Sequence, residues 1–388
     1  MSAWKTYTIA EIGDVITGRT PTSSVDAYYG GDTPFLTPSD DMDNKYVLQT
    51  KRTLSAQGVM SVECAVVPPE AICVSCIGSN LGKVTITTQK TVTNQQINTV
   101  VVDQDRFDLD YMYYALVRLG RTLNARSKVC TAIPNINKSE FSTYTISCPD
   151  LQTQKRIGRA LAVLDEKLSI NKQINENLVR QAQIIYRSYC MPHTDSNRAS
   201  LQSFSSGTLS DVIEIHDAHR KPLPRNIRCD LEKIYPYYGA VSCVDYVDDY
   251  IFDGEYILLA EDGTVIRDDG RAVLQYVTGK FWVNNHAHVV TGKNGFNTQV
   301  AYVLLTLTNV STAVTGAVQS KISQSNLKKV PIVIPSPEAL QICEEAFKPL
   351  FAEIQTLRAE NEQLIHMRDS LADALMSHQY AFDDMSPC

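Results

Sequence analysis

Four histidines fall into two close pairs, and histidine is the side chain that most often binds a metal ion. The pairs are His216 with His219 and His286 with His288. A zinc site needs three or four ligands, and cysteines or carboxylates at a defined spacing usually complete it. No such set accompanies either pair. The sequence therefore favours structural or ligand-facing histidines over a metal site.

Ten cysteines are scattered along the chain, and only Cys73 and Cys76 form a CxxC pair. Residues three apart on a strand point to opposite faces, so we expect both thiols to pack in the interior. Scattered cysteines of this kind are typical of reduced thiols in a cytoplasmic protein. The N-terminal residues lack an apolar signal core, and no segment approaches the roughly 20 apolar residues of a membrane span. We therefore expect neither secretion nor membrane insertion.

Two motifs that would suggest catalysis are incomplete. An amino-methyltransferase needs an Asn/Asp-Pro-Pro-aromatic element, but the diproline at residues 68–69 lies between Val67 and Glu70. Residues 78–84 resemble a phosphate-binding loop that is one residue short and lacks the hydroxyl after Lys83. A turn whose amides and lysine approach a phosphate explains this loop better. We expect no catalytic residues and no cofactor in this chain, and a stand-alone enzyme on an unfamiliar fold is disfavoured.

Loop side chains of the types that read base edges occur in both halves of the chain. Arginine, lysine, asparagine and glutamine are the usual readers in a DNA groove. In the first half the candidates are Thr20, Asn80, Lys83, Asn94, Gln95, Arg126, Lys128, Asn135 and Asn137. In the second half they are His219, Arg220, Lys221, Tyr238, Arg267 and Lys321. For each of them, an ordinary polar surface residue is the alternative interpretation.

The distribution of charge allows anion binding even though the net charge is -7. Residues 111–139 contain five basic side chains and no acidic one, and residues 270–337 contain six and again no acidic one. Such separated basic stretches indicate two local surfaces that face an anion such as DNA phosphate. The alternative is a chance pattern on solvated faces.

The chain reads as an internal repeat of two domains, each followed by a long helix. Residues 135–149 align with residues 321–335, and residues 9–12 align loosely with 209–212. The alignment matches Ile136 with Ile322, Phe141 with Leu327, Ile146 with Ile332 and Pro149 with Pro335. The middles of the two domains match poorly. One scaffold that carries two different surfaces accounts for this pattern.

Each domain is expected to be a mixed α/β unit of roughly 130–150 residues, an ordinary domain size. The expected strands are residues 71–76 and 98–102, with counterparts at 255–260 and 287–290. Short helices are expected at residues 107–121 and 298–307.

Apolar heptads predict the two long helices. The first seam runs Ile157, Leu161, Leu164, Leu168, Leu178, Ala182, Ile185 and Tyr189, with Asn171 and Asn175 at two of its positions. The second runs Phe347, Leu350, Ile354, Leu357, Leu364, Leu371 and Leu375, with polar breaks at Asn361 and Arg368. Pro349 marks either a kink or the real start of the second helix.

A long helix cannot bury its apolar stripe alone, so we expect the two helices to pair antiparallel within the chain. Homodimerisation through the heptads is the alternative. The seam asparagines either pair and fix the register or lie exposed near a fraying seam.

With these elements in order, the chain resembles the specificity subunits of type I restriction-modification systems. The resemblance rests on residues 12–21, 28–40, 78–83 and 94–98, and on the helix entry at 149–157. It covers essentially the whole chain. The second half departs from it, because residues 216–223 and 237–240 replace the glycine-proline string of the first half, and this leaves the second domain's contact residues less defined.

The resemblance implies a non-catalytic DNA-binding subunit with an α+β fold. Two target-recognition domains would each read one half of a gapped, asymmetric site on double-stranded DNA, and the antiparallel helices would set the gap. The partners would be two copies of a modification subunit, which binds S-adenosylmethionine and methylates adenine N6. A restriction subunit using ATP and Mg could join them. The different-class alternative is a coiled-coil scaffold or adaptor that binds only protein.

The expected boundaries follow from these elements. They are 1–150 for the first recognition domain, 151–190 for the first helix, 191–207 for a linker, 208–335 for the second domain, 336–379 for the second helix and 380–388 for a tail.

Overall fold

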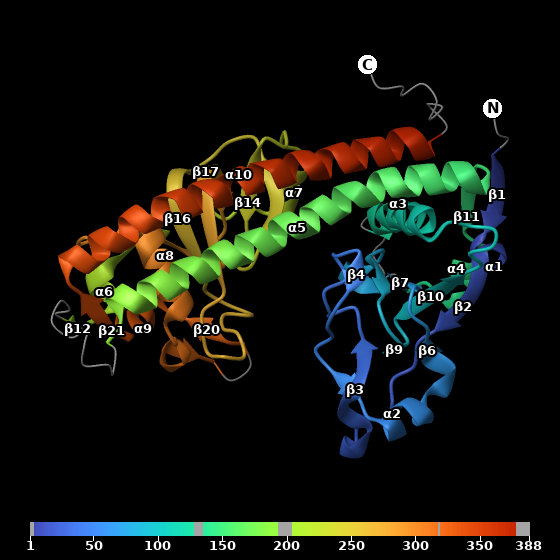
Figure 1. Cartoon of the computed structure of the whole chain (residues 1–388), viewed down its shortest axis with the longest axis horizontal. Coiled ribbons are helices and arrows are strands. Elements are labelled where there is room, and N and C mark those ends of the chain that lie inside the picture. Colours follow the sequence, from blue (N-terminus) through green and yellow to red (C-terminus); the bar gives the residue numbers. More distant parts are fainter. Residues whose placement is uncertain (1–3, 128–134, 193–203, 317–318, 378–388) are drawn as a thin grey trace. The chain divides into compact units, whose positions relative to one another are not determined.

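The computed structural model describes residues 4–127, 135–192, 204–316 and 319–377. The chain divides into two compact units: unit 1 is Met1–Ser169 with Glu362–Cys388, and unit 2 is Ile170–Asn361. Each unit contains a mixed α/β domain and part of each of two long helices, α5 (Leu151–Cys190) and α10 (Pro337–Met376) (Figure 1). This architecture confirms the α+β class that the sequence predicts.

In each unit the first strand of the domain pairs with the last. In unit 1, β1 (Lys5–Thr8) is antiparallel to β11 (Thr145–Cys148). In unit 2, β12 (Phe204–Thr208) is antiparallel to β21 (Pro331–Pro335). Since β11 leads into α5 and β21 leads into α10, this pairing joins the base of each long helix to the start of its own domain.

The central sheet of unit 1 has five strands in the order β2-β10-β7-β8-β4. Their bounds are β2 (Gly13–Thr17), β10 (Ile97–Val102), β7 (Ile72–Ser75), β8 (Val84–Thr87) and β4 (Tyr46–Val47). The first four alternate in direction, and β4 is parallel to β8. Their β-branched residues suit a buried pleated surface. The helix α3 (Leu109–Ser127) buries Tyr111, Met112 and Leu116 in the same core.

A second, four-stranded sheet in unit 1 has the order β5-β3-β9-β6. Its strands are β5 (Thr53–Leu54), β3 (Tyr29–Leu36), β9 (Thr91–Thr93) and β6 (Val66–Val67). With α2 (Ala56–Ser61) it surrounds a small core that contains Phe35, Leu54 and Val92.

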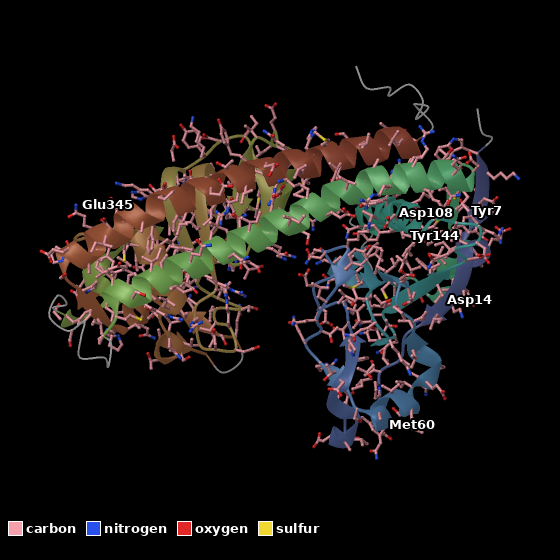
Figure 2. The ribbon with its side chains drawn as sticks, viewed as in Figure 1. Tyr7, Asp14, Met60, Asp108, Tyr144 and Glu345 are labelled. Carbon is pink, nitrogen blue, oxygen red and sulfur yellow. The ribbon has the colours of Figure 1, made fainter. Side chains whose placement is uncertain are left out.

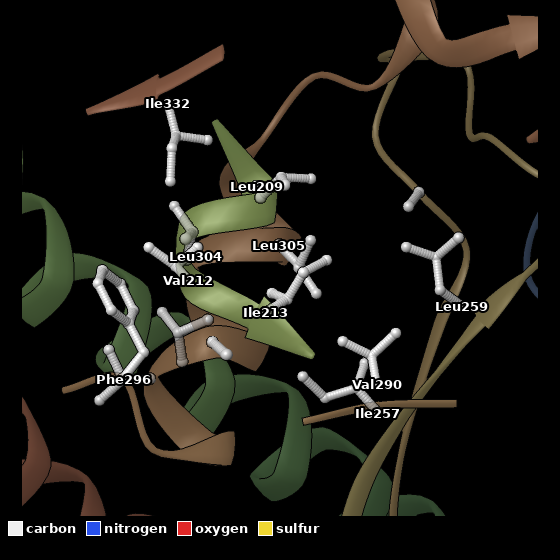
Figure 3. Close-up of a cluster of buried hydrophobic side chains, with 14 of the residues drawn as sticks. Leu209, Val212, Ile213, Ile257, Leu259, Val290, Phe296, Leu304, Leu305 and Ile332 are labelled. Carbon is white, nitrogen blue, oxygen red and sulfur yellow. The ribbon is translucent and has the colours of Figure 1, made fainter. Parts of the chain in front are cut away.

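The sheet of unit 2 has six strands in the order β13-β18-β16-β17-β14-β15. Their bounds are β13 (Ile213–Ile215), β18 (Ala287–Gly292), β16 (Phe252–Ala260), β17 (Leu274–Val283), β14 (Tyr235–Tyr238) and β15 (Cys243–Val247). The helix α8 (Thr298–Leu307) packs against β18 and β16. Leu304 and Leu305 of this helix lie in one buried cluster with Val290 and Ile257 (Figure 3). Shorter elements are α7 (Arg225–Cys229), β19 (Val314–Thr315) and β20 (Lys321–Ile322).

The internal repeat is confirmed element by element. The short helix α1 (Ile9–Ile12) corresponds to α6 (Leu209–Val212), and α4 (Lys138–Thr143) corresponds to α9 (Gln324–Lys328). Both α1 and α6 begin with a capping box, which satisfies free backbone donors at the helix start. Equivalent backbone bonds join Ile9 N to the Tyr144 carbonyl and Leu209 N to the Val330 carbonyl, over 2.9 and 3.0 Å. Of these residues, Tyr144 is labelled in Figure 2.

The repeat fails where the sequence alignment fails, in the middles of the domains. Unit 1 inserts its four-stranded sheet there, whereas unit 2 adds the β14–β15 hairpin to the end of its main sheet. Each insertion leaves the four shared strands in the same order, β2-β10-β7-β8 and β13-β18-β16-β17. The two units therefore share one scaffold and differ in the strands inserted into it.

The long helices pair antiparallel, as the heptads predict. In unit 2, Asn171 contacts Asn361, and Cys190 Sγ lies 3.3 Å from Cys343 Sγ, so residue numbers fall along α10 as they rise along α5. In unit 1, Arg368 Nη1 donates to Asp165 Oδ1 over 2.7 Å. The helix α10 begins at Pro337, so the prediction that Pro349 marks its start is wrong.

The apolar seam of the helices is continuous with the core of each domain. In unit 1, Leu161 and Leu375 belong to the same buried cluster as Tyr111. In unit 2, Tyr186 and Phe351 belong to the same cluster as Leu304. Burial of a large side chain stabilises the fold by about 1.5–3 kcal/mol, so the helix segments and the domain of a unit stabilise each other through this shared core.

Candidate nucleic-acid interface

Four loops of unit 1 meet at one edge of the central sheet. They are residues 18–20, 76–83, 94–96 and 135–137, and we call them the loop edge of unit 1. They meet because the antiparallel ladder places the ends of β2 and β7 beside the starts of β10 and β8. Direct bonds join the loops: Gly18 N donates to the Ile97 carbonyl, and Ile77 pairs with Asn135.

The loop edge of unit 1 contains every first-half candidate whose side chain the structure describes. These are Thr20, Asn80, Lys83, Asn94, Gln95, Asn135 and Asn137. The side chain of Arg126 and the whole of Lys128 lie outside the described residues. Residues dispersed over more than 100 positions of the sequence are thus brought to one edge by the sheet.

Tight backbone packing holds the first of these loops. A Cβ on Gly18 would lie 2.0 Å from the Asn94 carbonyl oxygen, so only glycine fits. Arg19 N donates to the Thr93 carbonyl over 2.8 Å, and Thr20 Oγ1 donates to Gln95 Oε1 over 2.5 Å. The backbone beneath Thr20 and Gln95 is therefore fixed before any ligand arrives.

Arg19 is a residue of this edge that sequence reasoning missed. Its side chain is exposed and has no hydrogen-bond or ion-pair partner among the described residues. An arginine fork can bond two acceptors of a guanine edge at once. Its place between Gly18 and Thr20 was the available signal, because both neighbours already suggested a functional turn.

Two of the predicted amides have internal roles instead. Asn94 is 8% exposed, and its side chain bonds both the backbone N and the side chain of Gln96. Asn137 accepts from Glu140 N over 2.9 Å and so caps α4. Because the Asn94 amide is buried and used within its own turn, the structure argues against a base contact by this residue, which stays an untested prediction.

Lys83 stands at the rim of the same edge in a surface ion pair. Its Nζ lies 2.7 Å from Asp43 Oδ2, and both side chains are partly exposed. An exposed pair of this kind contributes little to stability, about 0–1 kcal/mol. The lysine can therefore exchange its carboxylate partner for a phosphate at small cost.

An equivalent edge exists in unit 2. Its loops are residues 216–221, 261–273, 284–286 and 321–323, which we call the loop edge of unit 2. The same backbone bonds build both edges. The bond from Cys76 N to the Gln96 carbonyl in unit 1 corresponds to the bond from Glu261 N to the His286 carbonyl in unit 2. The bond from Ile136 N to the Cys76 carbonyl corresponds to the bond from Ile322 N to the Glu261 carbonyl. The β-bridge Ile77–Asn135 corresponds to the bridge Asp262–Lys321.

Most of the second-half candidates lie on the loop edge of unit 2. His219, Lys221 and Arg267 are exposed there, and Lys321 is paired with Glu261 over 3.2 Å. Tyr238 ends β14 instead, where its carbonyl accepts from Asn284 N over 3.0 Å, so it lies beside the edge.

Arg220 differs from the other candidates because its guanidinium is bonded within the protein. Its guanidinium bonds Asp217, Glu261 and the carbonyl of Ala287, and only 12% of its side chain is exposed. These internal bonds argue against a DNA contact by Arg220, which stays an untested prediction. Its two carboxylate partners fix it as a structural cation.

Arg220 belongs to a charged cluster that ties the loops of unit 2 together. Its members are Asp217, Arg220, Glu261, His288 and Lys321. Burial alone would raise the pKa of Asp217, but hydrogen bonds and charge from His288 and Arg220 outweigh it and hold the pKa below its usual value. The pKa of Glu261 is lowered in the same way, since Arg220 and Lys321 outweigh the effect of burial.

Asp217, Glu261 and His288 place their polar atoms within 4.8 Å of one another, a spacing that could suit a metal ion. Arg220 and Lys321 already supply positive charge to both carboxylates. A cation added beside two fixed cations would be repelled, so the cluster is assigned as an ion-pair network.

The two thiols of the CxxC pair are buried and stay protonated at neutral pH. Burial raises the pKa of the Cys73 thiol to about 12 and that of Cys76 to about 11.

The helix pair presents an apolar surface in addition to its buried seam. In unit 2, Ile170, Ile174 and Ile184 of α5 are 51%, 36% and 61% exposed. Residues at these spacings lie on one face of an α-helix. Exposed apolar side chains grouped in this way indicate an interaction surface. Among the described residues, no helix is long and apolar enough to cross a membrane.

The family profile for the type I restriction modification DNA specificity domain matches residues 1–180 and 203–366. This chain belongs to that family. The two matched segments coincide with the two repeats, each made of a domain and the start of its long helix.

Curated relatives and a solved structure carry the same description. A putative type I restriction enzyme specificity subunit of Haemophilus influenzae is 36% identical over 36% of this chain and 37% of its own length. The specificity subunit of the MjaIX enzyme of Methanocaldococcus jannaschii is 21% identical over 98% of this chain and 94% of its own. A crystal structure of a type I S subunit from M. genitalium covers 97% of this chain and 96% of its own, with 16% identity and a TM-score of 0.49.

Proposed function

We propose that this chain is the DNA-reading specificity subunit of a type I restriction-modification complex. Each domain reads one half of a gapped, asymmetric site on double-stranded DNA through its loop edge. The chain itself is the non-catalytic part of the complex. The observation that carries the proposal is that candidate base-reading residues of both halves gather on equivalent edges of one repeated sheet.

The two edges share their frame and differ in what they present. Unit 1 offers Arg19, Thr20 and Gln95, and unit 2 offers His219 and Arg267. Because different side chains recognise different base edges, a frame with two unlike surfaces reads two unlike half-sites. A protein-only scaffold would not need polar readers at matched places in both repeats, so the adaptor alternative is less well supported.

The long helices have two roles in the proposal. Their paired length sets the number of unread base pairs between the half-sites. Their exposed apolar face, with Ile170, Ile174 and Ile184, binds the modification subunits. Two copies of that subunit are expected because the chain contains two repeats. Those subunits carry S-adenosylmethionine and methylate adenine N6. A restriction subunit that uses ATP and Mg joins where the system has one.

Genome-wide mapping of methylated adenine tests the proposal. The chain is co-expressed with the methyltransferase encoded beside it, in a host that lacks adenine methylation at such sites. We expect one gapped motif to become methylated, and we expect it to disappear when this chain is deleted.

The matched control is the methyltransferase expressed alone, which should give no motif. Methylation that is unchanged by deletion, together with no DNA binding by the purified complex, would contradict the proposal.

A further inference from the structure

His288 and Asn98 occupy equivalent positions at the two loop edges. Asn98 Nδ2 donates to the Ile136 carbonyl over 3.3 Å, and His288 Nε2 lies 2.8 Å from the Ile322 carbonyl. Ile136 and Ile322 are themselves equivalent in the repeat. Both side chains thus tie a central strand to the loop that precedes a short helix.

The partners on the other side of each residue are equivalent too. In unit 1, Thr17 Oγ1 donates to Asn98 Oδ1 over 2.7 Å. In unit 2, Asp217 Oδ2 lies 2.6 Å from His288 Nδ1. A neutral hydroxyl–amide pair in one repeat is therefore replaced by a carboxylate–imidazole pair in the other.

Both ring nitrogens of His288 face acceptors. Nδ1 meets a carboxylate, and Nε2 meets a backbone carbonyl, neither of which can donate a hydrogen. A neutral imidazole has one N–H, so it can satisfy only one of these bonds, whereas the imidazolium satisfies both. The ring is 1% exposed, which prevents water from replacing a lost partner.

We propose that His288 is held as an imidazolium that fastens the loop edge of unit 2, and that loss of its proton releases the segment 321–324, which runs from β20 into the start of α9. In unit 1, Asn98 forms the equivalent ties without a titratable proton, so that edge stays fastened. His288 is a positioning residue, because it acts on the loops and does not itself reach the surface.

The charged groups that face His288 are Asp217, Arg220, Glu261 and Lys321, and the neutral Gln324 amide donates to Asp217 Oδ2 from α9. The two carboxyl pKa values are lowered, so both carboxylates stay ionised from neutral to alkaline pH. The arginine remains charged throughout. Lys321→Arg removes the remaining titratable cation and is expected to keep the transition.

The first test uses the full chain without DNA. The ring-nitrogen chemical shifts of ¹⁵N-labelled histidines are followed from about pH 6 to pH 9, and loss of signal in His288→Asn assigns the resonances. We expect both nitrogens of His288 to be protonated at neutral pH. Their proton loss should coincide with about tenfold faster hydrogen exchange at residues 321–324.

A rebuilt variant supplies the matched comparison. The double substitution Asp217→Thr with His288→Asn recreates the pair found in unit 1, and its exchange should not depend on this titration. His286→Asn changes a neighbouring histidine that is 49% exposed beside Asp262, and it should keep the wild-type pH profile. A single protonated nitrogen across the whole range would overturn the proposal, and so would proton loss without faster exchange.

The consequence for DNA rests on the proposed function. Preference for an intact site over one with the second half-site scrambled should fall about tenfold as His288 loses its proton, while preference at the first half-site holds. If the loop opens as expected and this preference stays constant, then the assignment of base reading to this edge fails, and the role of His288 in fastening the loop stands.

Discussion

Arg19 shows how a single side chain is prepared for recognition. Its backbone is tied to the Thr93 carbonyl, and the neighbouring Gly18 leaves no space for movement toward Asn94. The guanidinium itself is exposed and without a partner among the described residues. Because the backbone of Arg19 is already fixed, only the rotamer freedom of its side chain is lost on binding.

Arg19→Ala should therefore weaken binding of the intact site by about 1–3 kcal/mol and relax one position of the first half-site. The matched control is Lys90→Ala, which removes the same charge from an exposed turn at the opposite end of β8. Binding titrations against duplexes with each base replaced in turn measure the effect. An equal loss for every sequence would make Arg19 a phosphate contact, and no loss would remove it from the interface.

Residue type alone did not distinguish polar side chains that are available to contact DNA bases from polar side chains that are bonded within the protein. Asn94 and Arg220 have the chemistry to read bases, but the fold uses one within a turn and the other among buried carboxylates. The difference is decided by neighbours far away in the sequence, such as Glu261. The sequence analysis did not select Arg19, because the residues next to it in the sequence do not show that its side chain is exposed and without a partner among the described residues.

At the scale of elements, polar residues in the helix seam define the register of the pair. Asn171 is fully buried, and its Nδ2 donates to Asn361 Oδ1 over 2.8 Å and to Glu360 Oε2 over 2.6 Å. The expected pairing of seam asparagines is confirmed here. The side-chain oxygens of Asn171 and Asn175 are both buried without a partner among the described residues, so the two residues differ in that only Asn171 has an amide nitrogen bonded across the seam.

Asn171→Ala should destabilise unit 2 by about 1–3 kcal/mol, because it removes the buried donor of the two bonds to Asn361 Oδ1 and Glu360 Oε2. Asn175→Ala is the control, since it deletes a seam amide that makes no side-chain hydrogen bond among the described residues, and its cost should be smaller. Urea unfolding with unchanged slope measures both free energies. Equal losses would show that the Asn171 bonds do not stabilise the helix pair.

Gly158 explains an apparent flaw in the first helix. A Cβ at this position would lie 2.4 Å from Asp108 Oδ1 and 2.8 Å from Tyr111 N. The glycine therefore allows α5 to approach the start of α3 closely. Its cost in helix propensity, about 1 kcal/mol, is offset by packing that the heptad pattern alone does not reveal.

At the scale of the whole molecule, helix length should govern the spacing of the recognised site. One heptad inserted after Ser169 and another before Glu362 would lengthen each helix by about 10 Å. At about 3.4 Å per base pair, the unread gap should grow by about three base pairs. Methylome sequencing of the co-expressed complex reads the new motif directly.

Insertion into α5 alone is the matched control. It prevents the Asn171–Asn361 and Asp165–Arg368 contacts from forming together, so it should lower stability and abolish methylation without producing a motif of new length. A motif with the original gap after the double insertion would show that the helices do not set the spacing.

The sequence by itself determined the repeat, the two long helices and the class of protein. Heptad spacing, β-branched runs and the similar domain ends can each be recognised within a short stretch of sequence, because each reflects burial along one element. The aligned segments at residues 135–149 and 321–335 already located the equivalent strands and short helices. The match of Ile136 with Ile322 held down to individual backbone bonds.

Only the tertiary structure decided which polar residues share an edge and which are used up inside. The antiparallel ladders bring residues 20, 80, 95 and 135 together, and no local pattern encodes that convergence. The equivalence of Asn98 and His288 was hidden for the same reason, since the two residues differ in type and are matched only through the carbonyls they bond. Burial and partner geometry arise from contacts distant in the sequence, so they become visible only after the chain has folded.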